Sequence, residues 1–526
     1  MSLRSLCCSL LVLGTTVLVR AQVDSVRVRY AGTITATDLR EYLDVLASDA
    51  YEGRETGTQG QKMAARYIRE HFASFGIPPV PDAKGKGLIN GYEQPFPLEV
   101  TKPGGLSLLV DGTPIGFMQD FFYLSEKLQQ DYATDTVIFA GFGNRSGDRD
   151  PYAGVDARNT TALVLEDGES AVKRADRPSP DLFQQLTRKA AAAEAAGVRV
   201  LLVASTNARA MMEQYAHYIT TPRMKLVDEK SKAAANNRAP QVIIIDKATA
   251  ERILKRGRSN WKKALKGAGK AARAIACPFV VRYVSGRQEL QGENVLGYVE
   301  GSDKKDELVV ITAHYDHIGK DEEHGVYNGA DDDGSGTVAV LEMAQAFAQA
   351  KAEGHGPRRS VLFMPVSGEE KGLLGSEWYS DHPVFPLAHT VADLNIDMIG
   401  RVDSTHINSV PYVYIIGSDR LSTELHRINE EANATYTKLV LDNTFNSEED
   451  PNRFYYRSDH YNFAKHGIPV IFYFNGVHED YHQPGDEVGK IRFDLLEQRA
   501  RLVFHTAWEL ANREQRIVAD KPMPKE

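Results

Sequence analysis

Cysteine is scarce in this chain of 526 residues: it has three, and Cys7 and Cys8 stand within the first ten positions. Only Cys277 remains further along, so the chain beyond its N-terminal segment can form no internal disulfide. No pattern of partner residues surrounds Cys277 to support a thiol nucleophile. Disulfide-stapled scaffolds and cysteine hydrolases are therefore excluded, and stability is expected to come from the size of the hydrophobic core.

Long basic runs are also missing, and the formal net charge is -9, so nucleic acid is not an expected partner. Long apolar runs are missing beyond the N-terminus, which predicts no membrane span in the mature chain. The N-terminus itself is typical of an export signal: Arg4 precedes the apolar stretch "LLVLGTTVLV", and a small-residue cleavage site lies near Ala21. We therefore expect residues 1–21 to be removed and the protein to be periplasmic or secreted.

The length predicts more than one domain, and the pattern of the chain divides it into three stretches after the signal. Residues 22–118 open with two helical patterns, "TATDLREYLDVLAS" and "TGTQGQKMAARYIREHFASFG", and then become rich in glycine and proline. Residues 119–269 hold short apolar strands and one clear helix, "DLFQQLTRKAAAAEAAG". We expect this stretch to be a small inserted α/β domain, a separate lobe without catalytic or metal-binding residues.

Residues 270–526 alternate buried strands with helices. The expected strands lie in "ELVVITAHYDH", "SVLFMPVSGEE", "VADLNIDMIG" and "IPVIFYFNG", and the expected helices are "GSGTVAVLEMAQAFAQA" and "RFDLLEQRARLVFHTAWELANRE". This alternation predicts an α/β fold, a three-layer sandwich around a mixed, mostly parallel central sheet.

Potential metal ligands recur at the ends of these strands, where sites form in open α/β sheets. They are His314 and Asp316, the aspartates of "NGADDDGSG", the pair Glu369 and Glu370, Asp397, and His482. Each has an ordinary structural alternative, such as a hydrogen-bonded core histidine, a helix N-cap or a solvated loop pair. Because such accidents would have to coincide at several strand ends, one common site is the better interpretation.

The mixture of imidazole and carboxylate groups suits zinc, which tolerates both nitrogen and oxygen donors. Two histidines and three carboxylates are too many for one tetrahedral ion. They suit two Zn²⁺ ions about 3.5–4 Å apart that share one carboxylate. Such a pair activates a water molecule and polarises a carbonyl group, as amide hydrolysis requires.

The segments "HYDH", "NGADDDGSGT", "SGEEKGLLGS", "NIDMIG" and "DYHQPGDEV" together resemble the co-catalytic zinc aminopeptidases of peptidase family M28. The resemblance implies that His314 and Asp397 hold one zinc ion, that Glu370 and His482 hold the other, and that Asp332 bridges them. It also implies a cis peptide bond after Asp332. The insert resembles a protease-associated (PA) domain through "AGFG", "YAGVDARNTTALVLEDG" and "KAAAAEAAGVRVLLVAS".

Further roles concern residues that surround the predicted ions. A carboxylate bound to zinc is a poor base, so Glu369, beside the ligand Glu370, is expected to move the proton from the attacking water to the leaving amine. The resemblance implies that Tyr481 offers its hydroxyl to the oxyanion and that Asp316 orients the His314 ring. It places Ser458 and Asp459 near the substrate pocket.

The expected function is a zinc exopeptidase, most simply an aminopeptidase that acts on peptides, and three alternatives stand beside it. A binding protein of this fold would have lost ligands, and a glutaminyl cyclase-like enzyme would use one zinc ion. A carboxypeptidase of the same fold is the main rival, because it needs a cation for the substrate carboxylate whereas an aminopeptidase needs acidic groups for the amine. The cationic candidates are Arg453 and Arg457, and the acidic ones are Glu448, Glu449, Asp450 and Asp459.

Overall fold

The computed structural model describes most of the chain after the predicted signal. The described residues are 23–102, 104–125, 127–128, 130–145, 150–166, 182–227, 239–284, 286–408 and 411–523. The predicted signal, residues 1–21, lies outside them. Within these ranges, no helix combines the length and the apolarity that crossing a bilayer demands.

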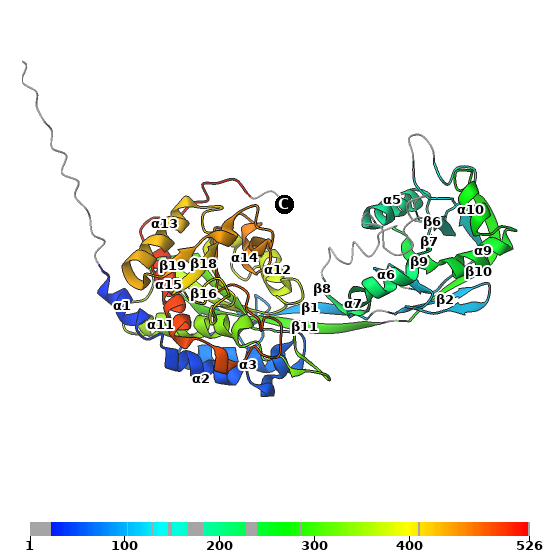
Figure 1. Cartoon of the computed structure of the whole chain (residues 1–526). Helices are drawn as coiled ribbons and strands as arrows, with labels where there is room; N and C mark the ends of the chain where they lie inside the picture. Colours follow the sequence, from blue (N-terminus) through cyan, green and yellow to red (C-terminus); the bar gives the residue numbers. More distant parts are fainter. Residues whose placement is uncertain are drawn as a thin grey trace, which may run out of the picture. The chain divides into compact units, whose positions relative to one another are not determined.

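The chain forms two compact units, which Figure 1 shows in the colours of the sequence. The first unit consists of Met1–Phe96 and Gly292–Glu526, and the second of Pro97–Gln291. The second unit is therefore wider than the insert expected from the sequence, residues 119–269. The physical reason is that the strand after the expected insert, Arg273–Tyr283, pairs with Tyr132–Phe139 inside it, and the strand before the insert, Leu106–Val110, pairs with Arg273–Tyr283. Both flanks therefore join its sheet.

The described part of the first unit is built around a seven-stranded sheet with the order β12-β16-β13-β17-β20-β18-β19. Its strands are β12 (Gly297–Val299), β13 (Lys304–His314), β16 (Arg359–Val366), β17 (Thr390–Ile396), β18 (Tyr412–Ile416), β19 (Val440–Asp442) and β20 (Val470–Phe474). Strands β16, β13, β17 and β20 run parallel, whereas β12 and β18 are antiparallel to β16 and β20, respectively. The mixed, mostly parallel sheet predicted from the sequence is confirmed.

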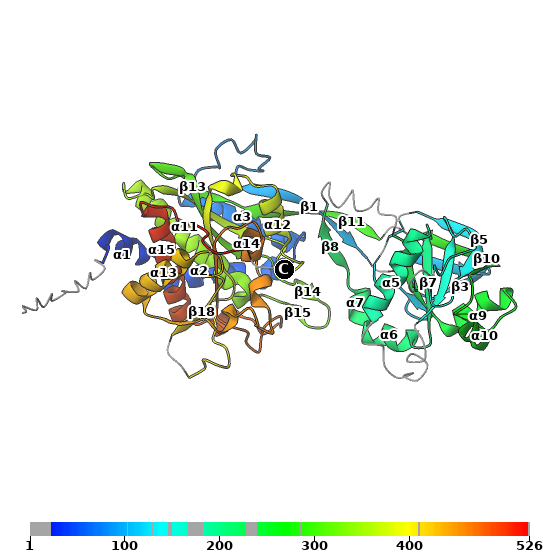
Figure 2. The same cartoon turned by 90° about the horizontal axis from the view of Figure 1, so that it is seen from above.

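Helices cover both faces of this sheet, which gives the predicted three layers (Figures 1 and 2). Along β13, Val309 and Ile311 join one hydrophobic cluster, whereas Leu308 and Val310 join another, as the alternation of side chains along a strand requires. The first cluster includes side chains from α1 (Ser25–Ala31), α2 (Ala36–Leu46), α3 (Gln59–Ser74), α11 (Gly336–Ala352), α13 (Thr423–Ala432) and α15 (Phe493–Asn512). The second includes side chains from α12 (Leu374–Asp381) and α14 (His460–Ala464).

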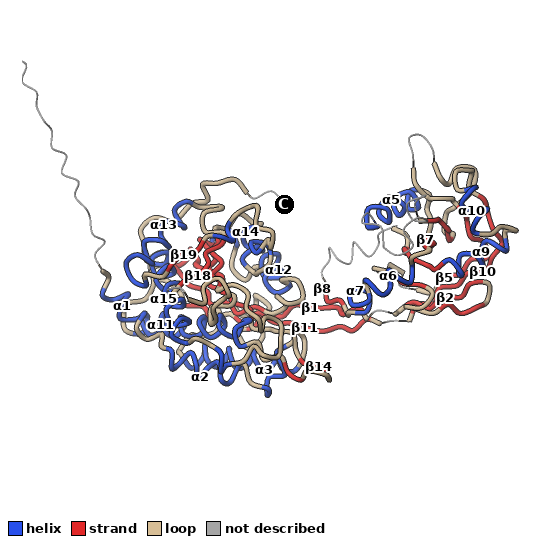
Figure 3. The backbone as a smooth tube through the Cα atoms, viewed as in Figure 1, coloured by secondary structure: helices blue, strands red, loops and turns tan. Residues whose placement is uncertain are grey.

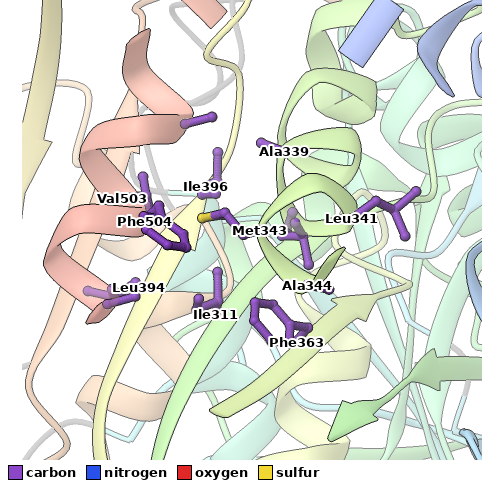
Figure 4. Packing of buried hydrophobic residues seen from close by; sticks show 14 of the residues in the cluster. Ile311, Ala339, Leu341, Met343, Ala344, Phe363, Leu394, Ile396, Val503 and Phe504 are labelled. Carbon is purple, nitrogen blue, oxygen red and sulfur yellow. The ribbon is translucent and has the colours of Figure 1, made fainter. Parts of the chain in front are cut away.

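Packing fixes the position of α11, the helix that follows the aspartate-rich segment. Figure 4 shows Met343 and Ala344 of this helix close to Ile311 of β13 and to Phe504 of α15. These side chains are fully buried. Burial of a side chain of this size stabilises a fold by about 1.5–3 kcal/mol, so α11 is held firmly against the sheet. Its N-terminus, which carries the aspartates, is therefore placed rigidly at the sheet edge.

The second unit has its own eight-stranded sheet, with the order β3-β2-β10-β5-β6-β7-β9-β4 in its described residues (Figure 3). The strands are β2 (Leu106–Val110), β3 (Thr113–Ile115), β4 (Phe121–Phe122), β5 (Tyr132–Phe139), β6 (Thr161–Leu165), β7 (Val200–Ser205), β9 (Gln241–Asp246) and β10 (Arg273–Tyr283). The helices are α5 (Leu182–Ala195), α6 (Ala208–Gln214), α7 (Ala216–Thr220), α9 (Lys247–Arg256) and α10 (Trp261–Gly267). A three-stranded sheet combines β11 (Arg287–Val295) and β1 (Glu93–Thr101), which span the two points of the sequence where the units divide, with β8 (Arg223–Leu226) of the second unit.

Candidate metal centre

The predicted ligands gather where four parallel strands end. His314 is the last residue of β13, Glu370 lies in the loop after β16, Asp397 follows β17, and His482 lies in the loop after β20. Because these strands are parallel neighbours, their carboxyl ends share one edge of the sheet. The loops that follow them therefore bring residues far apart in the sequence into one place.

Asp332 lies between two histidines and offers one carboxylate oxygen to each. Its Oδ1 is 3.2 Å from His314 Nε2, and its Oδ2 is 3.1 Å from His482 Nε2. It belongs to the short turn Ala330–Ser335, which leads into α11, and its peptide bond to Asp333 is cis, as the family resemblance implies. Asp332 is positioned to be shared by two neighbouring centres.

Two groups of ligand atoms surround this carboxylate. One group consists of His314, Asp332 and Asp397, and the other of His317, Asp332 and Glu370. Each residue offers one nitrogen or oxygen atom, and within a group these atoms all lie within 4.8 Å of one another. His482 adjoins the second group, since its Nε2 is 3.2 Å from Glu370 Oε2. Ligand atoms bound at 2.0–2.1 Å to one tetrahedral ion lie about 3.4 Å apart, so the spacing of these groups fits zinc.

The charges of the cluster also favour a cation. Burial alone would raise the pKa of Asp332, but His314 and His482 hold it well below its ordinary value. Burial alone would lower the pKa of His482, but the carboxylates of Asp332 and Glu370 raise it to about 10. Burial raises the pKa of Glu369 well above its ordinary value, and the charges of Glu370 and Asp397 act in the same direction. A divalent cation would compensate the negative charge buried here.

Hydrogen bonds from neighbouring residues orient the carboxylates. Ser458 Oγ donates to Asp397 Oδ2 at 2.7 Å and accepts from Asn395 Nδ2 at 2.8 Å. The main-chain N–H of Asp332 donates to Asp486 at 3.0 Å, which ties the bridging residue to the loop after β20. Supporting bonds of this kind fix the direction of a metal ligand and are part of the site.

Asp316 contacts His314 through its main chain. His314 Nδ1 hydrogen-bonds the main-chain carbonyl of Asp316 at 3.0 Å, whereas the carboxylate oxygen Oδ1 is 3.8 Å away. The carboxylate instead accepts from Thr56 Oγ1 at 2.6 Å and from the main-chain N–H of Glu369 at 3.3 Å. The carboxylate of Asp316 therefore holds the glutamate loop in place, and its carbonyl orients the histidine.

The two adjacent glutamates point to different parts of the site. Glu369 Oε2 is 4.0 Å from His314 Nε2, whereas Glu370 lies beside His482 and His317. Gly368 before them has φ +85°, a left-handed conformation that favours glycine and turns the chain sharply after β16. The loop can therefore direct the two carboxylates separately.

A small cavity opens onto the site. Its wall carries the metal-site residues His314, Asp332, Glu369, Asp397 and His482, together with Met398, Phe454, Arg457, Phe472, Phe474, Val477 and Tyr481. The Tyr481 ring stacks on the His482 ring at 3.9 Å between centroids, so Tyr481 lies beside the site.

Ser458 and Asp459, predicted for the substrate pocket, are not among the residues that line this cavity. Ser458 stands behind Asp397, and Asp459 accepts from Ser376 Oγ at 2.5 Å in a fully buried position. Their side chains support the framework instead of facing the cavity.

One residue of the cluster, His317, received no role from the sequence. The signal was present in the motif "HYDH", whose second histidine follows the first by three residues. His314 alone satisfied the ligand pattern expected for this motif, so nothing in the sequence assigned a separate role to the second histidine. The structure places it beside Glu370.

Comparison with known proteins agrees with this geometry. Residues 294–507 match the sequence model of Peptidase family M28. This segment contains all five predicted ligands.

Curated relatives include exopeptidases of both polarities. A probable leucine aminopeptidase of Arthroderma benhamiae is 30% identical over 216 residues, which cover 40% of this chain and 55% of that protein. Aminopeptidase YwaD of Bacillus subtilis is 26% identical over 232 residues, covering 43% of this chain and 46% of YwaD. A probable glutamate carboxypeptidase, LAMP1 of Arabidopsis thaliana, is 29% identical over 146 residues, covering 28% of this chain and 20% of LAMP1. The chain thus spans about half the length of the two aminopeptidases that it matches.

Proposed function

We propose that this protein is a zinc-dependent aminopeptidase that removes the N-terminal residue from peptides with a free amine. The observation that carries the proposal is the position of Asp332, whose Oδ1 lies 3.2 Å from His314 Nε2 and whose Oδ2 lies 3.1 Å from His482 Nε2. This is the arrangement that two ions sharing a carboxylate require. The match to family M28 and to two aminopeptidases supports the same activity.

The proposed ligands divide into two sets around the shared carboxylate. His314 and Asp397 would hold one Zn²⁺, and Glu370 and His482 the other, with Asp332 between them. When bound, the two ions would supply an acidified water molecule and polarise the scissile carbonyl. Both groups of ligand atoms found among the described residues belong to the first unit.

Two side chains of the cavity would carry the remaining chemistry. Glu369 would accept the proton of the attacking water and return it to the nitrogen of the leaving amine. Such proton transfer by a positioned side chain contributes about 10²–10⁴-fold to a rate. Tyr481 would donate its hydroxyl hydrogen to the oxygen that becomes negative during attack, and burial raises the pKa of this hydroxyl, which keeps it protonated.

The wall of the cavity supports a preference for apolar N-terminal residues. Met398, Phe454, Phe472 and Phe474 would surround the side chain of the residue to be removed. The carboxylates of Glu369 and Asp397 line the same cavity, and unligated oxygens there suit a free amino group.

A second candidate, a carboxypeptidase, has one specific observation in its favour. Arg457 lines the cavity, and a guanidinium group can bind a substrate carboxylate in a bidentate manner. Its guanidinium carbon lies 4.9 Å from the Phe454 ring centroid. Arg453, the other cationic candidate, lies over Tyr456 and is not among the residues that line the cavity.

A set of related peptides separates the two candidates. We expect the purified protein to release leucine from Leu-Ala-Phe and from its C-terminal amide, and to leave N-acetyl-Leu-Ala-Phe intact. Release of phenylalanine from the acetylated peptide, with the amide resistant, would replace the aminopeptidase by the carboxypeptidase. The variant Arg457→Met is a second test of the two candidates. If the protein is an aminopeptidase, the KM of this variant for Leu-Ala-Phe should stay within a few-fold of wild type. If it is a carboxypeptidase, the variant should lose affinity for the substrate.

We further propose that residues 1–21 direct export and that the second unit is a PA-like domain. The apolar stretch between Arg4 and Ala21 supports the first. The parallel strands β5, β6, β7 and β9, with helices between them, support the second. N-terminal sequencing of protein recovered from the periplasm or medium of a bacterial host should begin near Gln22, and recovery of the intact chain from the cytoplasm alone would reject export.

A further inference from the structure

His317 is an additional histidine inside the metal cluster, and the five-ligand scheme gives it no function. Its side chain is fully buried. Nδ1 lies 2.9 Å from Glu370 Oε1 and 3.8 Å from Asp332 Oδ2. For comparison, Nε2 of His482, a proposed ligand, lies 3.2 Å from Glu370 Oε2 and 3.1 Å from Asp332 Oδ2, so His317 is as close to Glu370 and somewhat further from Asp332.

The ring is not a core histidine with satisfied hydrogen bonds. Among the described residues, neither nitrogen of His317 has a hydrogen-bond partner of acceptable geometry, and the same is true of Glu370 Oε1 and Asp332 Oδ2. Buried polar atoms are almost always paired, because leaving one unpaired costs about 1–3 kcal/mol. Two of these atoms, Glu370 Oε1 and Asp332 Oδ2, lie 2.9 and 3.8 Å from a third, His317 Nδ1, which indicates a shared partner, and a cation can bind all three.

Packing, and not hydrogen bonding, fixes the orientation of this ring. The backbone of Gly329 lies against it so closely that a Cβ atom on that residue would stand 2.5 Å from His317 Cγ. The buried guanidinium of Arg54 in turn donates to the carbonyls of Gly329 and Asn328, at 2.9 and 2.7 Å. The His317 main-chain N–H donates to the carbonyl of Arg54 at 3.3 Å. Together these contacts hold Nδ1 toward the carboxylates without a second hydrogen bond to the ring.

We propose that His317 Nδ1 is a direct ligand of the ion on the Glu370 side. That ion would then have four protein ligands, namely His317, Asp332, Glu370 and His482. The ion on the other side would have three, His314, Asp332 and Asp397. This inference rests on the proposed function in one respect only, that a divalent metal occupies the cluster.

Unequal ligand sets give the two ions unequal properties. A zinc site with four protein ligands is closed and binds tightly, whereas one with three protein ligands keeps a position open for water or substrate. The Glu370 side should therefore fill first and exchange slowly. The His314 side, which adjoins Glu369, should fill second and be the side where the reacting groups meet.

The competing role is that of a positioning residue, in which His317 hydrogen-bonds Glu370 and touches no metal. The two roles differ in what a glutamine can replace. The amide N–H of His317→Gln could still donate to Glu370, so it should rescue a positioning role. It is a much weaker metal ligand than imidazole, so it should not rescue a ligand.

Titration of the metal-free full chain with Zn²⁺ by calorimetry tests the proposal without measuring activity. Wild type should show two binding steps of different affinity. In His317→Ala and His317→Gln the tighter step should weaken by more than about 100-fold, since loss of an outer-shell partner alone costs 10–100-fold. The control is His505→Ala, which removes another buried histidine whose Nδ1 accepts from Arg27 in α1. It should leave both steps unchanged.

Cobalt(II) gives an independent reading of the same variants. The visible absorption of Co²⁺ responds to coordination, so one equivalent bound to His317→Gln should give a different spectrum from one equivalent bound to wild type. Two unchanged binding steps and an unchanged spectrum in both variants would refute His317 as a ligand and leave the proposed function intact. Failure of wild type to bind any divalent metal would instead refute the proposed function.

Discussion

Exchange of Glu369 for glutamine separates the two jobs assigned to the glutamate pair. The amide has nearly the same size as the carboxylate but cannot accept a proton. Glu369 reaches toward His314 at 4.0 Å, and its main-chain N–H is held by Asp316 at 3.3 Å, a contact that the substitution leaves in place. The loop should keep its shape, and only the proton acceptor should be lost.

The expected loss follows from the size of general acid–base assistance. That assistance is worth about 10²–10⁴-fold in rate, or about 3–5 kcal/mol of transition-state stabilisation. We therefore expect Glu369→Gln to lower kcat by this factor with KM nearly unchanged and with metal content equal to that of wild type. Glu370→Gln should behave differently, because Glu370 lies 2.9–3.2 Å from His317 and His482 and is a proposed ligand. It should lose metal.

Zinc content by mass spectrometry and steady-state kinetics on Leu-Ala-Phe measure both effects. Glu353→Gln is a suitable control, since Glu353 follows α11 at the end opposite the aspartates, about 25 Å along the helix axis. It should match wild type in both assays. Full activity in Glu369→Gln, or loss of metal in that variant but not in Glu370→Gln, would refute the division of labour.

Further expectations concern the support of the site, the metal and the effect of pH. Ser458→Ala removes the donor to Asp397, so Zn²⁺ affinity should fall about 10–100-fold in competition with a chromophoric chelator, and unchanged affinity would contradict this role. Removal of metal by chelation should abolish hydrolysis and lower Tm in calorimetry, with both restored by Zn²⁺; an active metal-free chain would exclude the mechanism. Burial raises the pKa of Glu342 from 4.5 to about 8, so the folded chain keeps a proton that the unfolded chain loses, and stability should fall as pH rises through this window. Glu342→Gln should therefore raise the free energy of unfolding at pH 8 by about 2–4 kcal/mol in urea titrations and change it little at pH 4; an equal effect at both values would reject this cause.

Much of the fold was predictable because its signals are local. Thr35 caps the N-terminus of α2 and accepts from the Asp38 N–H, as the threonine at the start of the sequence pattern indicated, and α3 buries Ala64, Ile68 and Phe72 at the predicted spacing. Strand β18 was not predicted, although its apolar run lies between Pro411 and Gly417. Its pairing with β20 is antiparallel, and such a partner cannot be read from a short apolar run alone.

The sequence could predict which residues come together in the candidate site, but not the contacts that hold them there. The strand ends and the family resemblance named the five ligand positions. The hydrogen bond from Ser458 to Asp397 and the use of the Asp316 carbonyl depend on tertiary contacts between distant segments. His317 was visible in the sequence, yet only its burial beside Glu370 gave it a role.

The central claim is a pair of metal ions that share Asp332. Crystals of the zinc-loaded protein, with diffraction recorded on both sides of the zinc absorption edge, test it most directly. We expect two anomalous peaks about 3.5–4 Å apart, one on each side of the Asp332 carboxylate. A single peak, or peaks that do not contact Asp332, would contradict it.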